Sequence, residues 1–428
     1  MGPLLDVRLL LAVAAAAALV AVIGVRRPDW LLPGAAALGV ILCRPSAIGE
    51  RVPVLGPALL ALVGVVALVG ALRHRTRDVG VFPWPFLLFG TAWVWLGVHR
   101  LLNPLAEPNL ATSTLTVFLP VVVLYLVVRD RDLLARTRTA LVALVVVSAT
   151  LTVVALALVL VLGPGTTLLG SVPLGYAGAG ATDAGAGLYL PGALAYGVDP
   201  GALFPRMLGL GREPGMGALV LGWAFFAMPE SFPRAVLCKA VLLLALLGTQ
   251  STAGIGIAGV CLVLQAVLGR RTFSPLAAGA ATVAGVATVY LAVYDPTFGL
   301  LSKSQSGMSF STRNQATLDG LTALTTHPFT ATSTAPLSSV NLVAAIAVNG
   351  APWFVLGTLL LLAPVLRAGR RDPLRYGSLL VLMVMLTAQP LAGNAGVLLL
   401  AIIAYYAADR PTVRDPSPAA LSSLPVRA

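Results

Sequence analysis

The residues best suited to chemistry are arginines in the two longest polar stretches of an otherwise strongly apolar chain. Arg206 lies in the stretch 164–214 and Arg313 in the stretch 294–340. A guanidinium presents a planar fork of N–H donors that grips two oxygens of a phosphate or carboxylate. We therefore interpret Arg206 and Arg313 as residues that bind an anionic ligand.

The elements around these stretches follow from composition. Hydrophobic residues make up 58% and charged residues 10% of the 428 residues, and the mean hydropathy is +0.93. So apolar a chain cannot hide its side chains in a water-soluble core. A run of about 20 apolar residues is long enough to cross the roughly 30 Å hydrocarbon layer of a membrane. We predict an all-α, polytopic integral membrane protein with about 12 or 13 transmembrane helices.

The candidate spans are read directly from the apolar runs. They are 4–25, 53–72, 82–99, 110–128, 139–163, 215–230, 235–248, 251–268, 274–293, 341–366, 375–391 and 393–408. The shorter run 30–43 is either a further span or one arm of a re-entrant hairpin. The first run carries Arg8 and is followed by further runs, so we interpret it as an uncleaved anchor rather than a removed signal peptide.

The chain divides accordingly into membrane and extracytoplasmic segments. These are amino-terminal transmembrane helices in 1–163, an extracytoplasmic loop at 164–214, transmembrane helices in 215–293, a second extracytoplasmic loop with an amphipathic helix at 294–340, transmembrane helices in 341–408 and a disordered cytoplasmic tail at 409–428.

The net charge of +12 is explained by four arginine clusters. They comprise Arg73, Arg75 and Arg77; Arg129, Arg131, Arg136 and Arg138; Arg270 and Arg271; and Arg367, Arg370, Arg371 and Arg375. Counting spans places all four on one side, which the positive-inside rule makes the cytoplasm. Nucleic-acid binding is therefore the weaker interpretation. The count places both polar stretches outside the cytoplasm, and it places the amino terminus outside if 30–43 spans and inside if it does not.

No cofactor signature accompanies the arginines. Cys43, Cys238 and Cys261 lie in or beside apolar runs, and neither CxxC nor a Cys/His cluster occurs. The glycine-rich segment 175–187 does not match a nucleotide-binding loop, and we interpret it as a flexible loop. Neither polar stretch holds carboxylates at metal-ligand spacing. We predict that the protein uses neither a metal nor another cofactor.

The stretch 164–214 ends in a segment suited to anions. Pro214 fits the first turn of a helix, because its missing N–H costs nothing there. Arg212 and Glu213 then stand at a helix amino terminus, where backbone N–H groups and the helix dipole favour negative charge. With Arg206 one short loop away, this segment predicts a phosphate or pyrophosphate site. The alternative for Arg212 is pairing with Glu213 or contact with lipid headgroups.

The stretch 294–340 predicts an amphipathic helix on the outer membrane face. Its apolar residues recur at helical spacing: Ala316, Leu318, Leu321 and Leu324. Pro328 closes the segment. Arg313 falls in the first predicted turn, where a cation gains nothing from the helix dipole. A ligand-binding role is favoured over helix stability, and a lipid-headgroup contact is the alternative.

Three more polar residues join Arg212 as substrate-binding candidates. His327 precedes Pro328 at the predicted helix end, where an imidazole either acts as a base or caps the helix. Ser251 and Asn341 lie at the ends of apolar runs. There they either contact sugar hydroxyls or bond to the backbone.

An ordered set of short motifs resembles the O-antigen ligase and Wzy-type O-antigen polymerase superfamily. The set is Arg206-x-x-Gly209 with Pro214 and Ala218, the segment Gly248-Thr-Gln-Ser251-Thr-Ala-Gly254, Arg313 with its helix, His327-Pro-Phe329, and Asn341-Leu-Val with Gly350. The resemblance implies a metal-independent glycosyl transfer on the extracytoplasmic face of the cytoplasmic membrane. It also implies a polyprenyl-pyrophosphate-linked glycan donor whose pyrophosphate is held by Arg206 and Arg313.

Three positions depart from the family's pattern. Gly215 stands where an asparagine often follows the proline, Ala331-Thr-Ser333 replaces a Gly-x-Gly turn, and Val340 stands where ligases have a histidine. The missing histidine favours the polymerase branch and leaves Glu213 or His327 as the candidate base. The expected partners are the donor, a glycan or lipid-linked acceptor and membrane lipid, with no nucleic acid.

Two other classes of protein stay open. A secondary transporter or a lipid-linked glycan flippase commonly shows internal repeats and charged residues near the membrane centre. This chain has no obvious repeat, and Lys239 lies near the predicted cytoplasmic end of its apolar run. A non-catalytic scaffold would have no need of arginines on the outer face.

Overall fold

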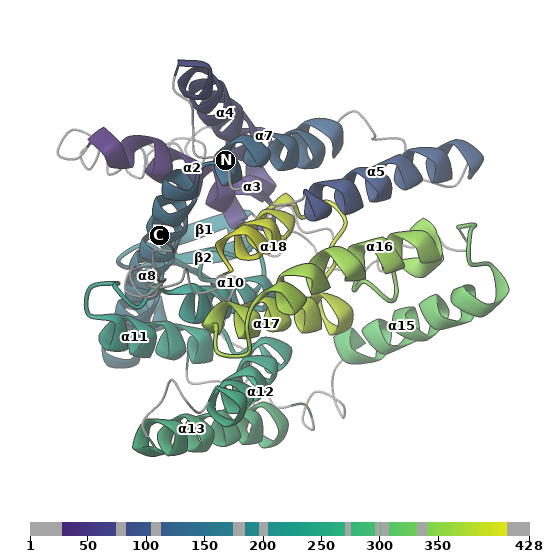
Figure 1. Ribbon diagram of the computed structural model, residues 1–428. Coiled ribbons are helices and arrows are strands. Elements are labelled where there is room, and N and C mark those ends of the chain that lie inside the picture. The colour runs from purple at the N-terminus through teal and green to yellow at the C-terminus, as the bar shows by residue number, and fades with distance from the viewer. Residues whose placement is uncertain are drawn as a thin grey trace, which may run out of the picture.

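Most of the described chain is helical, as predicted. The computed structural model describes residues 28–73, 83–103, 113–173, 185–196, 204–269, 275–295, 300, 308–331 and 340–408. Its longer helices are α2 (Leu31–Leu42), α4 (Leu55–Arg73), α5 (Trp84–Leu102), α7 (Leu119–Arg129), α8 (Arg131–Leu162), α10 (Pro214–Ala227), α11 (Ala235–Gly248), α12 (Thr252–Leu268), α13 (Pro275–Tyr294), α15 (Met308–Thr326), α16 (Ile346–Arg367), α17 (Pro373–Thr387) and α18 (Ala395–Ala407) (Figure 1). The short pieces are η1 (Pro28–Trp30), α3 (Ala47–Arg51), η2 (Thr114–Phe118) and α9 (Pro164–Thr167).

Local capping explains where helices depart from the apolar runs. α8 begins before the run 139–163 because the Asp130 side chain accepts hydrogen bonds from the first backbone N–H groups. α16 begins later than the run 341–366, because Asn341 accepts a bond from Ala344 N in a preceding turn.

Some of the predictions fall outside the described residues. They concern the run 4–25, the tail 409–428, residues 175–184 of the glycine-rich segment, and Arg75, Arg77, Arg270 and Arg271.

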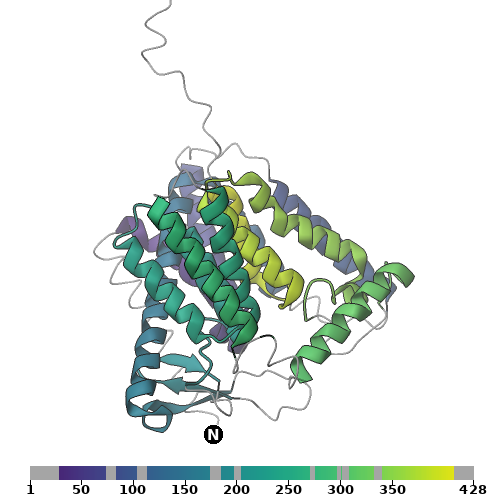
Figure 2. The same cartoon turned by 90° about the horizontal axis from the view of Figure 1, so that it is seen from below.

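The helix bundle has two chemically different ends. At the end where α8 begins, the Arg138 guanidinium donates to Ala227 O at the end of α10 (2.7 Å), and Arg367 lies over the ring of Tyr405 near the end of α18. We call this the arginine end. α8 has 32 residues and is therefore about 48 Å long. At its other end lies a small sheet, seen at the bottom of Figure 2, which defines the sheet end.

The small sheet is a feature that the sequence did not predict. Strands β1 (Leu168–Pro173), β2 (Gly185–Tyr189) and β3 (Ala193–Ala195) form an antiparallel sheet in the order β1-β2-β3. Tyr189 and Ala195 are buried with Val159 of α8 and Met207. Part of the predicted loop 164–214 is therefore a folded platform that packs on the end of α8.

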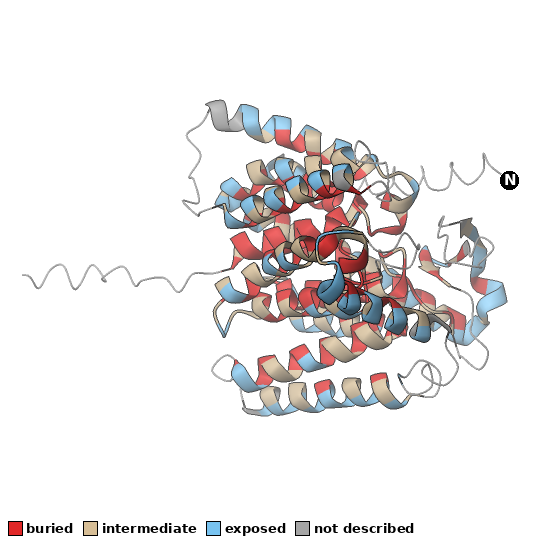
Figure 3. Cartoon of the chain, turned by 90° about the vertical axis from the view of Figure 1, so that its right-hand side faces the viewer, coloured by how far each residue is buried: buried red, intermediate tan, exposed pale blue. Residues whose placement is uncertain are grey.

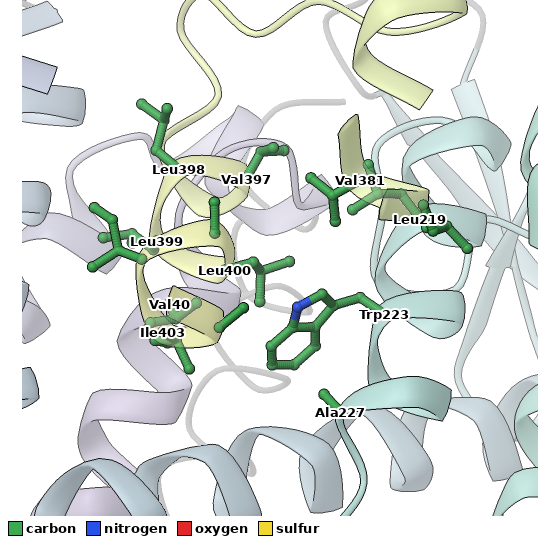
Figure 4. Close-up of a cluster of buried hydrophobic side chains, with 14 of the residues drawn as sticks. Val40, Leu219, Trp223, Ala227, Val381, Val397, Leu398, Leu399, Leu400 and Ile403 are labelled. Carbon is green, nitrogen blue, oxygen red and sulfur yellow. The ribbon is translucent and has the colours of Figure 1, made fainter. Parts of the chain in front are cut away.

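The core is formed where α18 meets α2, α10 and α17. Trp223 of α10 lies among Val381 of α17 and Val397 and Leu400 of α18, as Figure 4 shows. Nearly every residue of α18 is buried, which is expected of a helix that is apolar on all sides. Many large apolar side chains of the peripheral helices are exposed instead (Figure 3).

Two described helices, α8 and α16, are long and apolar enough to cross a membrane, judged by length and composition alone. Nine further apolar helical stretches of 10–17 residues occur in the described residues. One of these is α2, from the short run 30–43, which at 12 residues is about 18 Å long. Asp29 before α2 pairs with Arg136 at the arginine end (3.1 Å), whereas Ala47 N after it bonds to Leu210 O at the sheet end. The segment thus runs from one end of the bundle to the other.

Candidate functional site

A chain of alternating charges occupies the sheet end. Arg44 contacts Glu50 (3.1 Å), Glu50 contacts Arg212 (3.0 Å), Arg212 contacts Glu213 (3.5 Å) and Glu213 contacts Arg313 (3.9 Å). We call these five residues the charge chain. Its central members are largely buried, and Arg313 is more open, with 37% of its side chain exposed. The charge chain brings together three of the predicted site residues: Arg212 and Glu213 from one polar stretch and Arg313 from the other.

Arg212 is held by backbone pairing between two distant segments. Its N–H donates to Pro45 O (2.8 Å), and its carbonyl accepts from the Tyr196 hydroxyl (3.0 Å). Ser46, which caps α3, pairs with Gly211 in an isolated bridge. A Cβ at 211 would stand 2.8 Å from both Glu213 O and Met216 C, so glycine is needed for this segment to lie so close to the start of α10. The corner between α2 and α3 therefore fixes Arg212 in place.

Arg206 lies in an extended segment between the sheet and α11. Its carbonyl accepts from Tyr196 N (2.9 Å), and the N–H of the following Met207 donates to Gly248 O (3.0 Å). Gln250 Nε2 donates to Phe204 O (3.1 Å) two residues before it. The Arg206 side chain is half-buried. Tyr196 thus links the backbones of Arg206 and Arg212, while the convergence of the Arg206 and Arg313 guanidiniums stays a prediction.

Arg313 is carried by α15 and reaches across to the link between α17 and α18. Its Nη1 donates to Ala388 O (3.1 Å). Because α15 begins at Met308, Arg313 lies in the second helical turn rather than the first. A Cβ at Gly320 would stand 2.9 Å from Ala344 Cα, so α15 packs directly on the backbone before α16. This close packing sets the position from which Arg313 extends.

α15 packs on the rest of the protein by a face of small residues. Ala316 and Ala323 are buried on the protein side together with Gly320. The predicted apolar residues Leu318 and Leu321 are 48% and 47% exposed instead. Small residues face the protein because they allow close backbone approach, and the leucines are left on the outside of the molecule.

Glu213 is the most buried carboxylate of the charge chain. Only 9% of its side chain is exposed, and Gln389 Nε2 donates to its Oε2 over 3.4 Å. Gln389 is itself 2% exposed, and its Oε1 has no hydrogen-bond partner. A Cβ at Gly215 would meet the Gln389 amide, so glycine at this position makes room for the contact.

The three remaining candidates have different surroundings. Asn341 is 1% exposed, and its amide bonds to Thr317 Oγ1 (2.8 Å), Thr387 O (3.4 Å) and Ala344 N (2.7 Å). Ser251 is the N-cap of α12 and accepts from Gly254 N (3.3 Å). Both side chains therefore bond to their own protein. His327 is exposed just after α15 ends.

Two functional candidates were missed in the sequence: Glu50 and Gln389. Each lies in a short polar link between apolar helices, α2 to α4 and α17 to α18, and both links are at the same end as Arg212. The shared position of these links at the end that carries Arg212 is the signal that could have pointed to both residues. Across the described ranges, no three His, Cys, Asp or Glu side chains gather in a way that would hold a metal ion.

Comparison of the chain with protein-family models, with curated proteins and with solved structures finds no match.

Proposed function

We propose that this protein is a multi-pass cytoplasmic-membrane glycosyltransferase of the polysaccharide polymerase or ligase type. It would transfer a glycan from a polyprenyl-pyrophosphate carrier at its extracytoplasmic sheet end. The observation that carries the proposal is the contact of Arg313 with Glu213, beside Arg212, at the end of the bundle opposite the cytoplasmic-type arginine clusters. A cluster of guanidiniums on that side is unusual and favours an anionic ligand.

The membrane assignment rests on composition together with the fold. α8 and α16 meet the length for a span, and the described residues contain nine shorter apolar helical stretches. Exposed leucines and valines on the peripheral helices have hydrocarbon as their natural solvent. The described arginines of the second and fourth clusters share one end of the bundle, which fits the positive-inside rule.

The chemistry follows from the charges of the site. An acceptor hydroxyl oxygen forms a bond to the anomeric carbon of the donor, while the bond from that carbon to the pyrophosphate oxygen breaks. The hydroxyl proton passes to the Glu213 carboxylate, and the electron pair leaves with the pyrophosphate. Negative charge grows on the leaving group, where Arg313 and Arg206 would stabilise it. Polyprenyl pyrophosphate is released as the second product.

Transfer in reconstituted vesicles is the direct test of this function. The donor is a polyprenyl-pyrophosphate oligosaccharide, and the readout is lengthening of the glycan or its appearance on an acceptor. Arg313→Lys and Arg206→Lys should each reduce transfer about a hundredfold, because lysine keeps the charge but loses the two-pronged grip on phosphate.

Arg371→Lys is the matched control, since Arg371 is exposed in the link between α16 and α17 at the arginine end, and it should retain wild-type transfer. Equal effects from all three variants would mean that charge and orientation, rather than phosphate recognition, explain the arginines. Movement of an intact lipid-linked glycan across the bilayer without transfer would identify a flippase.

A further inference from the structure

Glu213 makes three contacts that are all long. Its carboxylate is 3.5 Å from Arg212 Nε, 3.9 Å from Arg313 Nη2 and 3.4 Å from Gln389 Nε2. Charge-assisted bonds of this kind are shorter when they are optimal, at about 2.7–2.9 Å. A buried carboxylate needs a cation nearby, because an unpaired charge is costly to keep out of water. The negative charge of Glu213 is thus compensated by the groups around it, although no single partner binds it tightly.

The two arginines beside Glu213 are not equivalent. Arg212 also binds Glu50 at 3.0 Å, its side chain is 15% exposed, and its backbone is fixed by Pro45 and Tyr196. Arg313 is 37% exposed, and within the described residues Glu213 is the one carboxylate it contacts. Arg212 is therefore a permanent partner, and Arg313 is the partner that an incoming anion is able to take over.

We propose that Glu213 is the resident counter-ion of Arg313 before a ligand binds, and that the pyrophosphate of the ligand displaces it. This inference rests on the proposed function. On displacement, the Glu213 carboxylate keeps Arg212 and Gln389 as partners, so its charge stays compensated. The displaced carboxylate then stands beside the bound pyrophosphate as a proton acceptor. After transfer, the Glu213 carboxylic acid releases its proton to water, and the return of the carboxylate to Arg313 competes with the polyprenyl pyrophosphate product and promotes product release.

The geometry supports an exchange rather than a rearrangement of the backbone. Arg313 is anchored by Nη1 to Ala388 O, so Nη2 is able to change partners while the side chain stays in place. Glu213 is anchored by the start of α10, where it is the N-cap residue. A movement of the carboxylate toward Arg212 therefore needs only side-chain rotation.

The test measures binding of inorganic pyrophosphate to the purified protein in lipid nanodiscs by calorimetry. Glu213→Gln removes the competing charge while keeping the size and hydrogen-bonding capacity of the side chain. Its affinity for pyrophosphate should be about tenfold higher than that of the wild type, since a carboxylate about 4 Å from Arg313 no longer opposes the ligand. Its turnover in glycan transfer should fall, because the proton acceptor is lost.

Asp319→Asn is the matched control for net charge. Asp319 lies on the same helix as Arg313, is exposed and bonds to Gln315 rather than to an arginine. Its affinity for pyrophosphate should stay within about twofold of the wild type because an exposed charge is screened by salt. A similar gain in both variants would mean that net charge alone sets affinity, and would overturn the displacement.

Two outcomes separate this inference from the function on which it rests. Equal or weaker pyrophosphate binding by Glu213→Gln, with wild-type binding intact, overturns the displacement and leaves the proposed function standing. Absence of pyrophosphate binding by the wild-type protein overturns the proposed function itself. Glu213→Asp guards against a folding defect in the first variant: the shorter carboxylate withdraws from Arg313 but keeps its charge, and it should bind pyrophosphate more tightly than the wild type does.

Discussion

Replacing Gly217 by alanine should reduce glycan transfer about a hundredfold while leaving the helices of the protein formed. Gly217 lies in the second turn of α10, where the segment that carries Arg206 crosses it. A Cβ at this position would stand 2.8 Å from the carbonyl carbon of Leu208 and would overlap the carbonyl oxygen. Ordinary contacts need about 3.5 Å, so the segment around Arg206 has to move by about 1 Å. A misplacement of that size is enough to cost about two orders of magnitude in rate.

The assay compares transfer rate, membrane insertion and thermal stability of Gly217→Ala with those of Gly279→Ala. Gly279 is an exposed glycine of α13 with nothing within 4 Å of an added Cβ, so its substitution should be neutral or slightly stabilising. Wild-type transfer by Gly217→Ala would refute the reasoning, because it would show that the position of the Arg206 segment relative to α10 does not matter for the chemistry.

Three further predictions concern a buried asparagine, the charge chain and the need for metal or ATP. Asn341→Ala should lower the free energy of unfolding by about 1–3 kcal/mol, because it leaves buried partners such as Ala344 N unsatisfied; an unchanged melting temperature would contradict this. Glu50→Gln should destabilise the fold by about 2 kcal/mol, since Arg212 loses its closest counter-charge, and combining it with Arg212→Gln should cost less than the sum of the two single changes. Strict additivity in that thermal-unfolding cycle would mean that the pair is not coupled. Transfer in vesicles should persist after exhaustive chelation and ATP depletion, and a loss that Mg²⁺ or Mn²⁺ restores would show that a metal, rather than Arg206 and Arg313, stabilises the leaving group.

The helices were predictable because hydrophobic periodicity and length are strong signals. The run 235–248 coincides with α11, and most other described helices begin and end within a few residues of the expected positions. Departures have local causes, such as the Asp130 cap that extends α8 toward the arginine end. The sheet was missed because its strands are short, and because β2 and β3 are rich in glycine and alanine, which are depleted in typical strands.

The candidate site was predictable only in part. Arg212, Glu213 and Arg313 stand out in polar stretches, and the structure places them in one chain of contacts. Glu50 and Gln389 could not be selected in the same way, because their importance comes from tertiary contacts with residues more than 160 positions away. The small-residue face by which α15 packs on the protein was not predicted, since apolar spacing identifies a helix but does not say whether leucines or small residues face the protein.

The alternation of the charge chain has a consequence for how distant parts of the molecule communicate. A row that begins and ends with arginine always contains one more cation than anion, so a single excess positive charge is shared by Arg44, Arg212 and Arg313. When a glutamate turns toward one of its two neighbouring arginines, the charge of the other arginine is less well compensated. Occupation of Arg313 by an anion would therefore strengthen the hold of Glu213 on Arg212 and loosen that of Glu50, leaving Glu50 to Arg44 at the corner between α2 and α3. An anion on Arg313 would thus change the affinity of Arg44 for a ligand or lipid by some factor. By thermodynamic reciprocity, that ligand or lipid on Arg44 changes the affinity of Arg313 for the anion by the same factor.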